Sequence, residues 1–448
     1  MTDTFKTEPR GALVEGDRYL ALLAITLLGY ALMGKGFAYL GFPPLYVGEI
    51  TFFIGAVVFL RSGVLVASLA TVPSLMLVAL MVWVLARTVP FVSEYGVDSL
   101  RDSTVVMYGG FALIVIGLLL EDARRIDTVL RYYNILPASL PAIFVGFCLT
   151  LYWNEYIPSF YGSVPIVDIT TSAVGTHLAG TMVFVLIGCR KVSFRWLLVW
   201  LTTLTIVAAT NRGATLAVVA PVVFAMLMLG RIRLLLSAML AVVSIFAVLL
   251  AVEGILTPGN ETERSTRRLV SAHQIIKNAE SVLGDSGEQN VEGTKRWRLD
   301  WWEIIINDTI YGPNFWTGRG FGLNLADADG FQSPPEHAAT RSPHNVNMTL
   351  LARAGVPGLV LWSLVLISWA TMMMRAMLVA RSRGQKQWAD LFLFVICYAT
   401  SILINALFDV TLEGPMQGIW FWCLFGFGIG SAMIYRVQAT VGIGSSQR

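Results

Sequence analysis

A chain of 448 residues is long enough for two or three soluble domains, but 56% of its residues are hydrophobic and only 14% are charged. Soluble proteins carry roughly 25% charged residues, so this composition excludes a soluble protein and predicts a polytopic membrane protein. The formal net charge of +3 is too small to indicate a nucleic-acid partner.

Apolar runs of about 17 to 25 residues can cross a bilayer as helices, because a helix satisfies its own backbone hydrogen bonds. The chain contains about twelve such runs, which predicts an all-α membrane protein. The runs begin near Tyr19, Tyr46, Val64, Thr104, Ile135, Thr171, Trp196, Ala214, Leu234, Met348, Trp388 and Gln417. The segment before the first run is polar, and no small-residue cleavage pattern follows that run. We therefore expect the first run to be a retained span and not a cleaved signal peptide.

Basic residues indicate the orientation of these runs, because cytoplasmic loops carry an excess of Lys and Arg. With the N-terminus placed inside, the inside segments hold 18 basic residues and the short outside loops hold 4. Those four are Lys35, Arg87, Arg101 and Arg212. One extra or missing span would scramble this asymmetry, so we expect about twelve spans with both termini inside.

The connection between the ninth and tenth runs is the longest and is expected on the outside. It divides the chain into a first group of helices (1–252), this loop (253–345) and a last group with the tail (346–448). Apolar residues at three- and four-residue spacing predict helices at 266–283 and 298–308, although a solvated linker is the alternative. Four apolar side chains of the second helix could seat it on the bilayer interface: Trp301, Trp302, Ile305 and Ile306.

Three polar motifs lie on the predicted outer side. The first is Asn211-Arg212-Gly213, between two apolar runs. The second joins Arg296-Trp297-Arg298 and Trp302 to the turn Gly318-Arg319-Gly320. The third is Arg341-Ser342-Pro343-His344-Asn345, followed one helical stretch later by Gly355 and Gly358.

In this order and spacing, the motifs resemble the O-antigen ligase and O-antigen polymerase superfamily of bacterial membrane proteins. The resemblance covers 211–358 in motif and the whole chain in topology. It implies a many-span helical bundle with one large, partly helical periplasmic loop in the bacterial inner membrane. It also implies transfer of a glycan from undecaprenyl diphosphate to a hydroxyl acceptor, without a cofactor.

The resemblance suggests which residues form the site. Arg212 and Arg298 match the arginines of the family, and His344-Asn345 matches its histidine motif. For Arg212, a lone arginine at the end of a span, the alternative is an anchor at the membrane interface. Arg319 and Arg341 are further candidate contacts to phosphate or sugar, or else solvated charges. Two departures stand out. Arg296 competes with Arg298 for one family position, and Arg353 stands where an acidic residue is common.

These residue types suit the implied reaction. A diphosphate is a good leaving group, so cations that stabilise its growing negative charge lower the barrier. Arginine binds phosphate oxygens bidentately and stays charged. Histidine, with an unperturbed pKa of about 6.5, is the expected general base for the acceptor hydroxyl, and we assign this role to His344. Attack opposite the leaving group would invert the anomeric configuration.

Other groups are weaker candidates. Asp327-Ala328-Asp329 reads as a D-x-D pair, but it lies in a turn, and we expect no metal there. Asp409 and Glu413 could orient a histidine or bind sugar, or simply cap a helix. His177 and His273 are expected to be structural.

The sequence therefore predicts a metal-independent, inverting glycosyltransferase that works at the periplasmic face of the bilayer. Its partners would be a lipid-linked glycan and an acceptor, which is a lipid A-core sugar for a ligase or another lipid-linked repeat for a polymerase. Protein O-glycosylation is a third acceptor class. A polysaccharide transporter or flippase is the rival of a different class, but the internal repeats and broken helices typical of transporters are not evident.

Overall fold

The computed structural model describes residues 15–160, 164–237, 289–332 and 340–445, with isolated positions between 239 and 248. The helix expected at 266–283 lies outside these residues, as do His273, His337 and more than half of the ninth expected span. The described chain is helical apart from its connections and two short antiparallel hairpins.

The elements follow one another in this order. The first half contains α1 (Glu15–Met33), α2 (Lys35–Ala38), β1 (Gly41–Phe42), β2 (Leu45–Tyr46), α3 (Val47–Arg61), α4 (Leu65–Ser68), α5 (Val72–Thr88), α6 (Val92–Tyr95), α7 (Val97–Met107), α8 (Gly110–Glu121), α9 (Arg125–Tyr133), α10 (Ile135–Ala138), α11 (Leu140–Tyr152), β3 (Ser159–Phe160) and β4 (Val164–Pro165). The second half contains α12 (Thr171–Leu186), α13 (Phe194–Thr210), α14 (Arg212–Met228), α18 (Gln289–Thr309), α19 (Leu325–Asp329), α20 (Val346–Ser382), α21 (Lys386–Ala406) and α22 (Pro415–Ser445).

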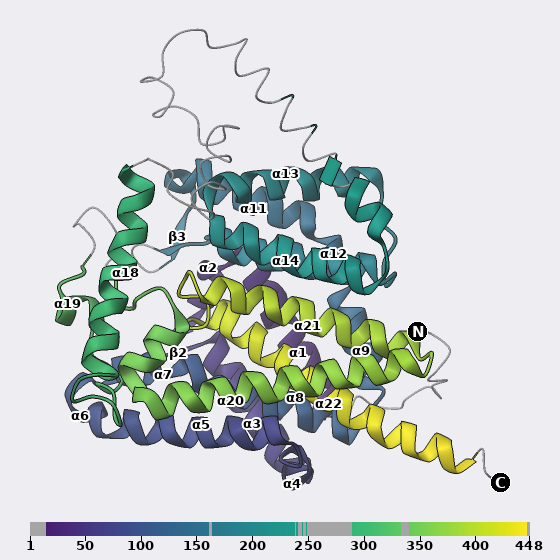
Figure 1. Cartoon of the computed structure of the whole chain (residues 1–448), viewed down its shortest axis with the longest axis horizontal. Helices are drawn as coiled ribbons and strands as arrows, with labels where there is room; N and C mark the ends of the chain where they lie inside the picture. Colours follow the sequence, from purple (N-terminus) through teal and green to yellow (C-terminus); the bar gives the residue numbers. More distant parts are fainter. Residues whose placement is uncertain are drawn as a thin grey trace.

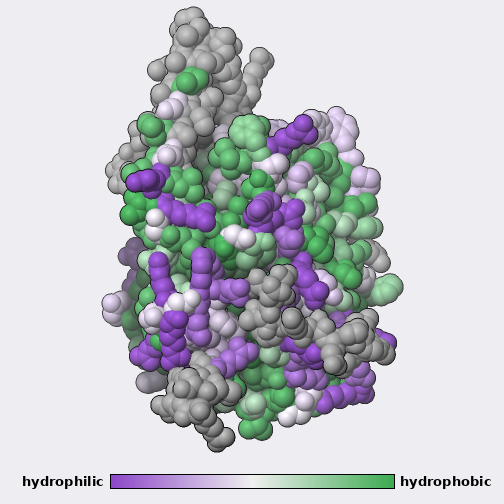
Figure 2. Space-filling model, turned by 90° about the vertical axis from the view of Figure 1, so that its right-hand side faces the viewer, coloured by the Kyte–Doolittle hydropathy of each residue, from purple (hydrophilic) through white to green (hydrophobic). Residues whose placement is uncertain are grey.

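The long helices run side by side, and α18 crosses one end of this bundle (Figure 1). Helix α20 packs between α5 and α21, and α22 packs against α8. The opposite end of the bundle, at the turn between α20 and α21, gathers hydrophilic side chains (Figure 2). Exposed basic residues there include Arg381, Arg383 and Lys386. That this end faces the cytoplasm stays a prediction from the positive-inside rule.

Among the residues that the structure describes, five helices are long and apolar enough to cross a membrane, or up to seven if each bent helix pair is one span. The bends are 43° between α7 and α8 and 51° between α9–α10 and α11. Three further apolar helices, α12, α13 and α14, have 16 or 17 residues. The protein is therefore a multi-pass membrane protein, while the count of twelve spans and the placement of the loop outside stay predictions.

Helices form at the predicted runs that the structure describes, but some begin elsewhere. The run expected from Val64 is divided into α4 and α5, because Thr71 and Pro73 start a new helix. Thr71 Oγ1 accepts a hydrogen bond from Ser74 N at 3.3 Å, and proline suits a first helical turn. The run expected from Thr104 begins earlier, since α7 starts at Val97.

Helix α20 is broken at Gly355, whose φ is +70°, and Pro357 follows. The break frees backbone groups, which need new partners where water is scarce. The turn at 315–320 supplies several of them. Arg319 N donates to Ala352 O at 2.8 Å, Gly320 N donates to Arg353 O at 3.0 Å, and Phe315 O accepts from Val356 N at 2.8 Å. The glycine-rich turn therefore locks the broken helix in place.

Helix α18 confirms the helix predicted at 298–308 and extends it. The expectation that its apolar side chains face the bilayer interface is wrong for two of them. Trp301 and Ile305 are fully buried and pack against Leu325, Leu351 and neighbouring residues of α19 and α20. The apolar face of α18 therefore attaches this helix to the protein, because burial against α20 removes those side chains from any solvent or lipid.

Candidate active site

His344 lies one residue before the cap of α20 and has a φ of +53°. It is the one non-glycine residue in the described part of the chain with a positive φ, a conformation that persists only where the surroundings hold it. Asn345 supplies part of that support. Its Oδ1 accepts from Asn347 N at 2.9 Å, and its Nδ2 donates to Leu407 O at 3.1 Å. Asn345 thus ties the start of α20 to the end of α21.

This connection brings Asp409 to His344. His344 Nδ1 lies 3.6 Å from Asp409 Oδ1, within ion-pair distance but too long for a hydrogen bond. Burial raises the pKa of Asp409, but polar contacts with His344, Ser172 and the Val410 N–H outweigh it and hold the pKa below its usual value. Asp409 therefore stays ionised beside the imidazole, and the pair resembles a base with its orienting carboxylate.

Arg298 on α18 lies close enough to this pair to interact with it electrostatically. Burial lowers the pKa of its guanidinium, the charge of Asp409 raises it and the charge of Arg212 lowers it. Its Nε is buried and has no hydrogen-bond partner among the residues that the structure describes. Burying such a donor is costly without a partner, so Arg298 is suited to an anionic ligand.

Arg212 begins α14, next to the cap residue Asn211, whose Oδ1 accepts from Ala214 N at 3.0 Å. The start of α14 packs tightly beside Phe408, since a Cβ at Gly213 would lie 2.9 Å from the Phe408 Cβ. Arg212 is therefore held next to the segment that carries Asp409. The positive end of a helix dipole adds to its charge at this point.

The two candidate arginines of the second motif differ in their surroundings. Arg296 is exposed, whereas Arg298 is half-buried and interacts with Arg212 and Asp409. The face of α18 that holds Arg298 is fixed to the histidine loop by Trp302, whose Nε1 donates to Pro343 O at 2.9 Å. This geometry favours Arg298 over Arg296 as the residue at the site.

Arg319 does not join this group. Its Nε donates to Asp308 Oδ2 at 2.7 Å and its Nη1 donates to Asp329 Oδ1 at 2.6 Å. Asp329 also accepts from Trp301 Nε1 at 2.7 Å. The second carboxylate of the D-x-D pair is thus engaged by Arg319, and both residues link α18 to α19. Since two carboxylates neutralise it, Arg319 holds the loop together and is poorly placed to bind phosphate.

Arg341 is also directed elsewhere, although it lies three residues before His344. Its Nη2 lies 3.2 Å from Asp102 and donates to Gly322 O at 2.9 Å, and its Nη1 lies 3.3 Å from Asp98. Arg353, 1% exposed, reaches the same Asp102 at 3.0 Å. Arg353, which stands where an acidic residue is common in the family, thus forms a buried ion pair with Asp102 of α7.

Sequence reasoning missed the two acidic residues of α7. Asp98 and Asp102 are spaced i, i+4, so they share one helix face, and that spacing beside an apolar run was an available signal.

Two weaker candidates of the sequence have structural contacts. Glu413 accepts from Thr349 Oγ1 at 2.8 Å, and burial raises the pKa of Glu413. Its backbone carbonyl accepts from Thr104 Oγ1 of α7 at 3.4 Å, so Glu413 links α20 to α7. His177 is buried with its Nδ1 2.7 Å from Tyr398 Oη, in keeping with a structural role.

The arrangement combines a base and two cations at one end of the bundle. His344 with Asp409 can accept a proton, and Arg298 and Arg212 can stabilise negative charge on a phosphate group. Among the residues that the structure describes, no three His, Cys, Asp or Glu side chains gather as metal ligands.

Comparison with known proteins agrees with this chemistry. Residues 197–363 match the model of a family described as O-antigen ligase. The matched region contains Arg212, Arg298 and His344 and ends within α20. The resemblance to the O-antigen ligase and polymerase superfamily is confirmed, and the match indicates glycan transfer of that general type. No curated protein matches the chain.

Proposed function

We propose that the protein transfers a glycan from undecaprenyl diphosphate to a hydroxyl acceptor, because residues 197–363 match the model of a family described as O-antigen ligase. The reaction takes place at the periplasmic face of the bacterial inner membrane, with both termini in the cytoplasm. The preferred reaction is ligation to a lipid A-core sugar. The observation that carries the proposal is the convergence of His344, Asp409, Arg298 and Arg212 at one end of the bundle.

In this mechanism Arg298 and Arg212 hold the diphosphate. Their guanidinium groups stabilise the negative charge that grows as the bond between the anomeric carbon and the diphosphate oxygen breaks. His344 takes the proton of the acceptor hydroxyl while its oxygen forms the new glycosidic bond, and the anomeric configuration inverts. Asp409 stabilises the imidazolium that results. The scheme uses no metal or cofactor, because the arginines supply the positive charge.

The base assignment is tested with His344→Asn. Asparagine tolerates the left-handed backbone that this position requires, so the loop is kept while the base is removed. Purified full-length protein in detergent is given the lipid-linked glycan and an acceptor, and release of undecaprenyl diphosphate is measured. We expect a rate loss of about 10²- to 10⁴-fold, the usual contribution of a general base. A variant with the full rate would remove His344 from the mechanism.

The same assay separates the acceptor classes. A ligase joins glycan to the lipid A-core, whereas a polymerase extends a second lipid-linked repeat and a protein transferase modifies a polypeptide hydroxyl. A transporter forms none of these products in detergent, because it catalyses no bond formation. Product analysis by mass spectrometry therefore identifies the acceptor and tests the enzyme assignment at once.

A further inference from the structure

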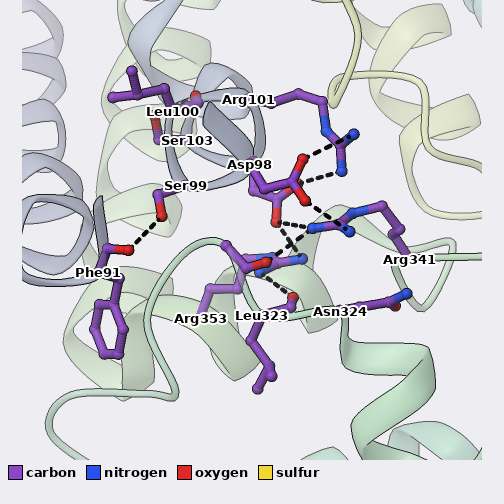
Figure 3. A network of polar contacts seen from close by, with 12 residues as sticks. Phe91, Asp98, Ser99, Leu100, Arg101, Ser103, Leu323, Asn324, Arg341 and Arg353 are labelled. Carbon is purple, nitrogen blue, oxygen red and sulfur yellow. Dashed lines mark hydrogen bonds and ion pairs between the residues drawn. The ribbon is translucent and has the colours of Figure 1, made fainter. Parts of the chain in front are cut away.

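A cluster of charged residues joins α7 to the histidine loop and to the first part of α20. Asp102, with a side chain 9% exposed, lies within 3.5 Å of Arg101, 3.2 Å of Arg341 and 3.0 Å of Arg353. Asp98 lies within 3.2 Å of Arg101 and 3.3 Å of Arg341. Figure 3 shows Arg101, Arg341 and Arg353 converging on the acidic face of α7.

The two inner arginines come from the two sides of His344 along the chain. Arg341 precedes it by three residues and also donates to Gly322 O at 2.9 Å. Arg353 follows in α20, just before the break at Gly355, and donates to Leu323 O at 3.0 Å. One carboxylate therefore fixes both the loop segment that leads into His344 and the helix segment that follows it.

His344 needs such fixation because its φ of +53° is unfavourable for a residue with a side chain. The cap by Asn345 and the bond from Trp302 to Pro343 O hold only the residues next to it. We propose that Asp102 is a positioning residue, which holds His344 in this conformation and facing Asp409 through Arg341 and Arg353. Arg341 then acts through Asp102 and does not contact the lipid diphosphate. This inference rests on the proposed function of His344.

The experiment is a double-mutant cycle on the full-length protein with Arg341→Gln, Asp102→Asn and the combined variant. We expect Arg341→Gln to lower kcat about tenfold and to leave KM for the lipid-linked donor within about twofold, because misplacing a catalytic group lowers the rate of the chemical step. The combined variant should be no worse than Asp102→Asn alone, since coupled residues are not additive. Asp102→Glu should recover part of the rate.

A substrate contact gives a different pattern. If Arg341→Gln raises the donor KM and its effect adds to that of Asp102→Asn, Arg341 binds donor itself and the positioning role is refuted. Asp102→Asn leaves Arg353 as an uncompensated buried charge and can fail to fold. In that case Asp102→Glu, which keeps a negative charge beside Arg353, replaces it in the cycle, and the combined variant should lose less than the two single losses together.

A measurement without turnover separates this inference from the proposed function. Amide hydrogen exchange of residues 342–349 should be faster in Arg341→Gln than in the unaltered protein. The matched control is Asp122→Asn. The Asp122 side chain is 14% exposed and pairs with Arg124, and its replacement should leave that exchange unchanged. Faster exchange in a protein without transferase activity would support the positioning role and refute the proposed function. Unchanged exchange and kcat in Arg341→Gln would overturn the positioning role alone.

Discussion

Replacing Asp409 with asparagine removes the negative charge beside His344 and keeps the size of the side chain. The amide oxygen can still accept from Val410 N, as the carboxylate does at 2.8 Å, so the local backbone is expected to stay in place. The imidazolium formed during the reaction then loses its counter-charge. We expect a slower reaction.

The size of the effect follows from the distance and the exposure. Two unit charges 3.6 Å apart interact by about 1 to 5 kcal/mol as the effective dielectric constant falls from about 80 to 20. The side chains of His344 and Asp409 are 27% and 29% exposed, so solvent screens much of this energy, and we take about 2 kcal/mol. That energy corresponds to a loss of about 30-fold in kcat/KM.

The pH dependence follows from the ionisation of Asp409. Burial raises the pKa of Asp409, but contacts with His344, Ser172 and the Val410 N–H lower it below its usual value, so the carboxylate is ionised throughout the working range. The stabilisation it provides would be lost only as the pH falls through that lowered pKa, so the loss in kcat/KM of Asp409→Asn should be about the same across the neutral range. The measurement is the rate of undecaprenyl diphosphate release between about pH 5 and about pH 9. A loss confined to one part of the pH range, or no loss at all, would refute the charge pairing; Asp390→Asn, beside Lys386 near the start of α21, is the control.

Two further predictions concern other parts of the site. Arg298→Lys keeps the charge but loses the bidentate fork, so kcat should fall at least tenfold although expression is normal; a rate equal to the unaltered protein would remove Arg298 from the diphosphate site. Gly318→Ala should lower the melting temperature, measured by scanning fluorimetry, because its Cβ would lie 2.5 Å from the Arg353 backbone. Gly330→Ala has a similar positive φ of +75° but open space around it, and so should cost only about 1 kcal/mol. Equal losses would show that backbone strain alone, and not the lock on α20, sets the effect.

Much of the fold followed from the sequence. Hydropathy and the sides on which basic residues fall predicted a multi-pass helical protein, because the bilayer imposes long apolar helices whatever their packing partners. The helix around Arg298 followed from its three- and four-residue spacing, which is a local property. The order of the arginine, glycine and histidine motifs was enough to predict the family, which the match of residues 197–363 confirms.

Tertiary structure decided which charges work together. Arg319 and Arg341 look like Arg298 in the sequence, but the first is neutralised by Asp308 and Asp329 and the second reaches α7. The glycine-rich turn at Gly318, singled out in the sequence as a family motif, completes the hydrogen bonds of a broken helix. Charge pairing depends on distances between side chains far apart along the chain, and periodicity carries no information on those distances. The sequence by itself therefore determined the membrane class, its helical character and the resemblance to the family. Only the packing of α7, α18 and α20 set Asp409 beside His344 and separated the site arginines from the structural ones.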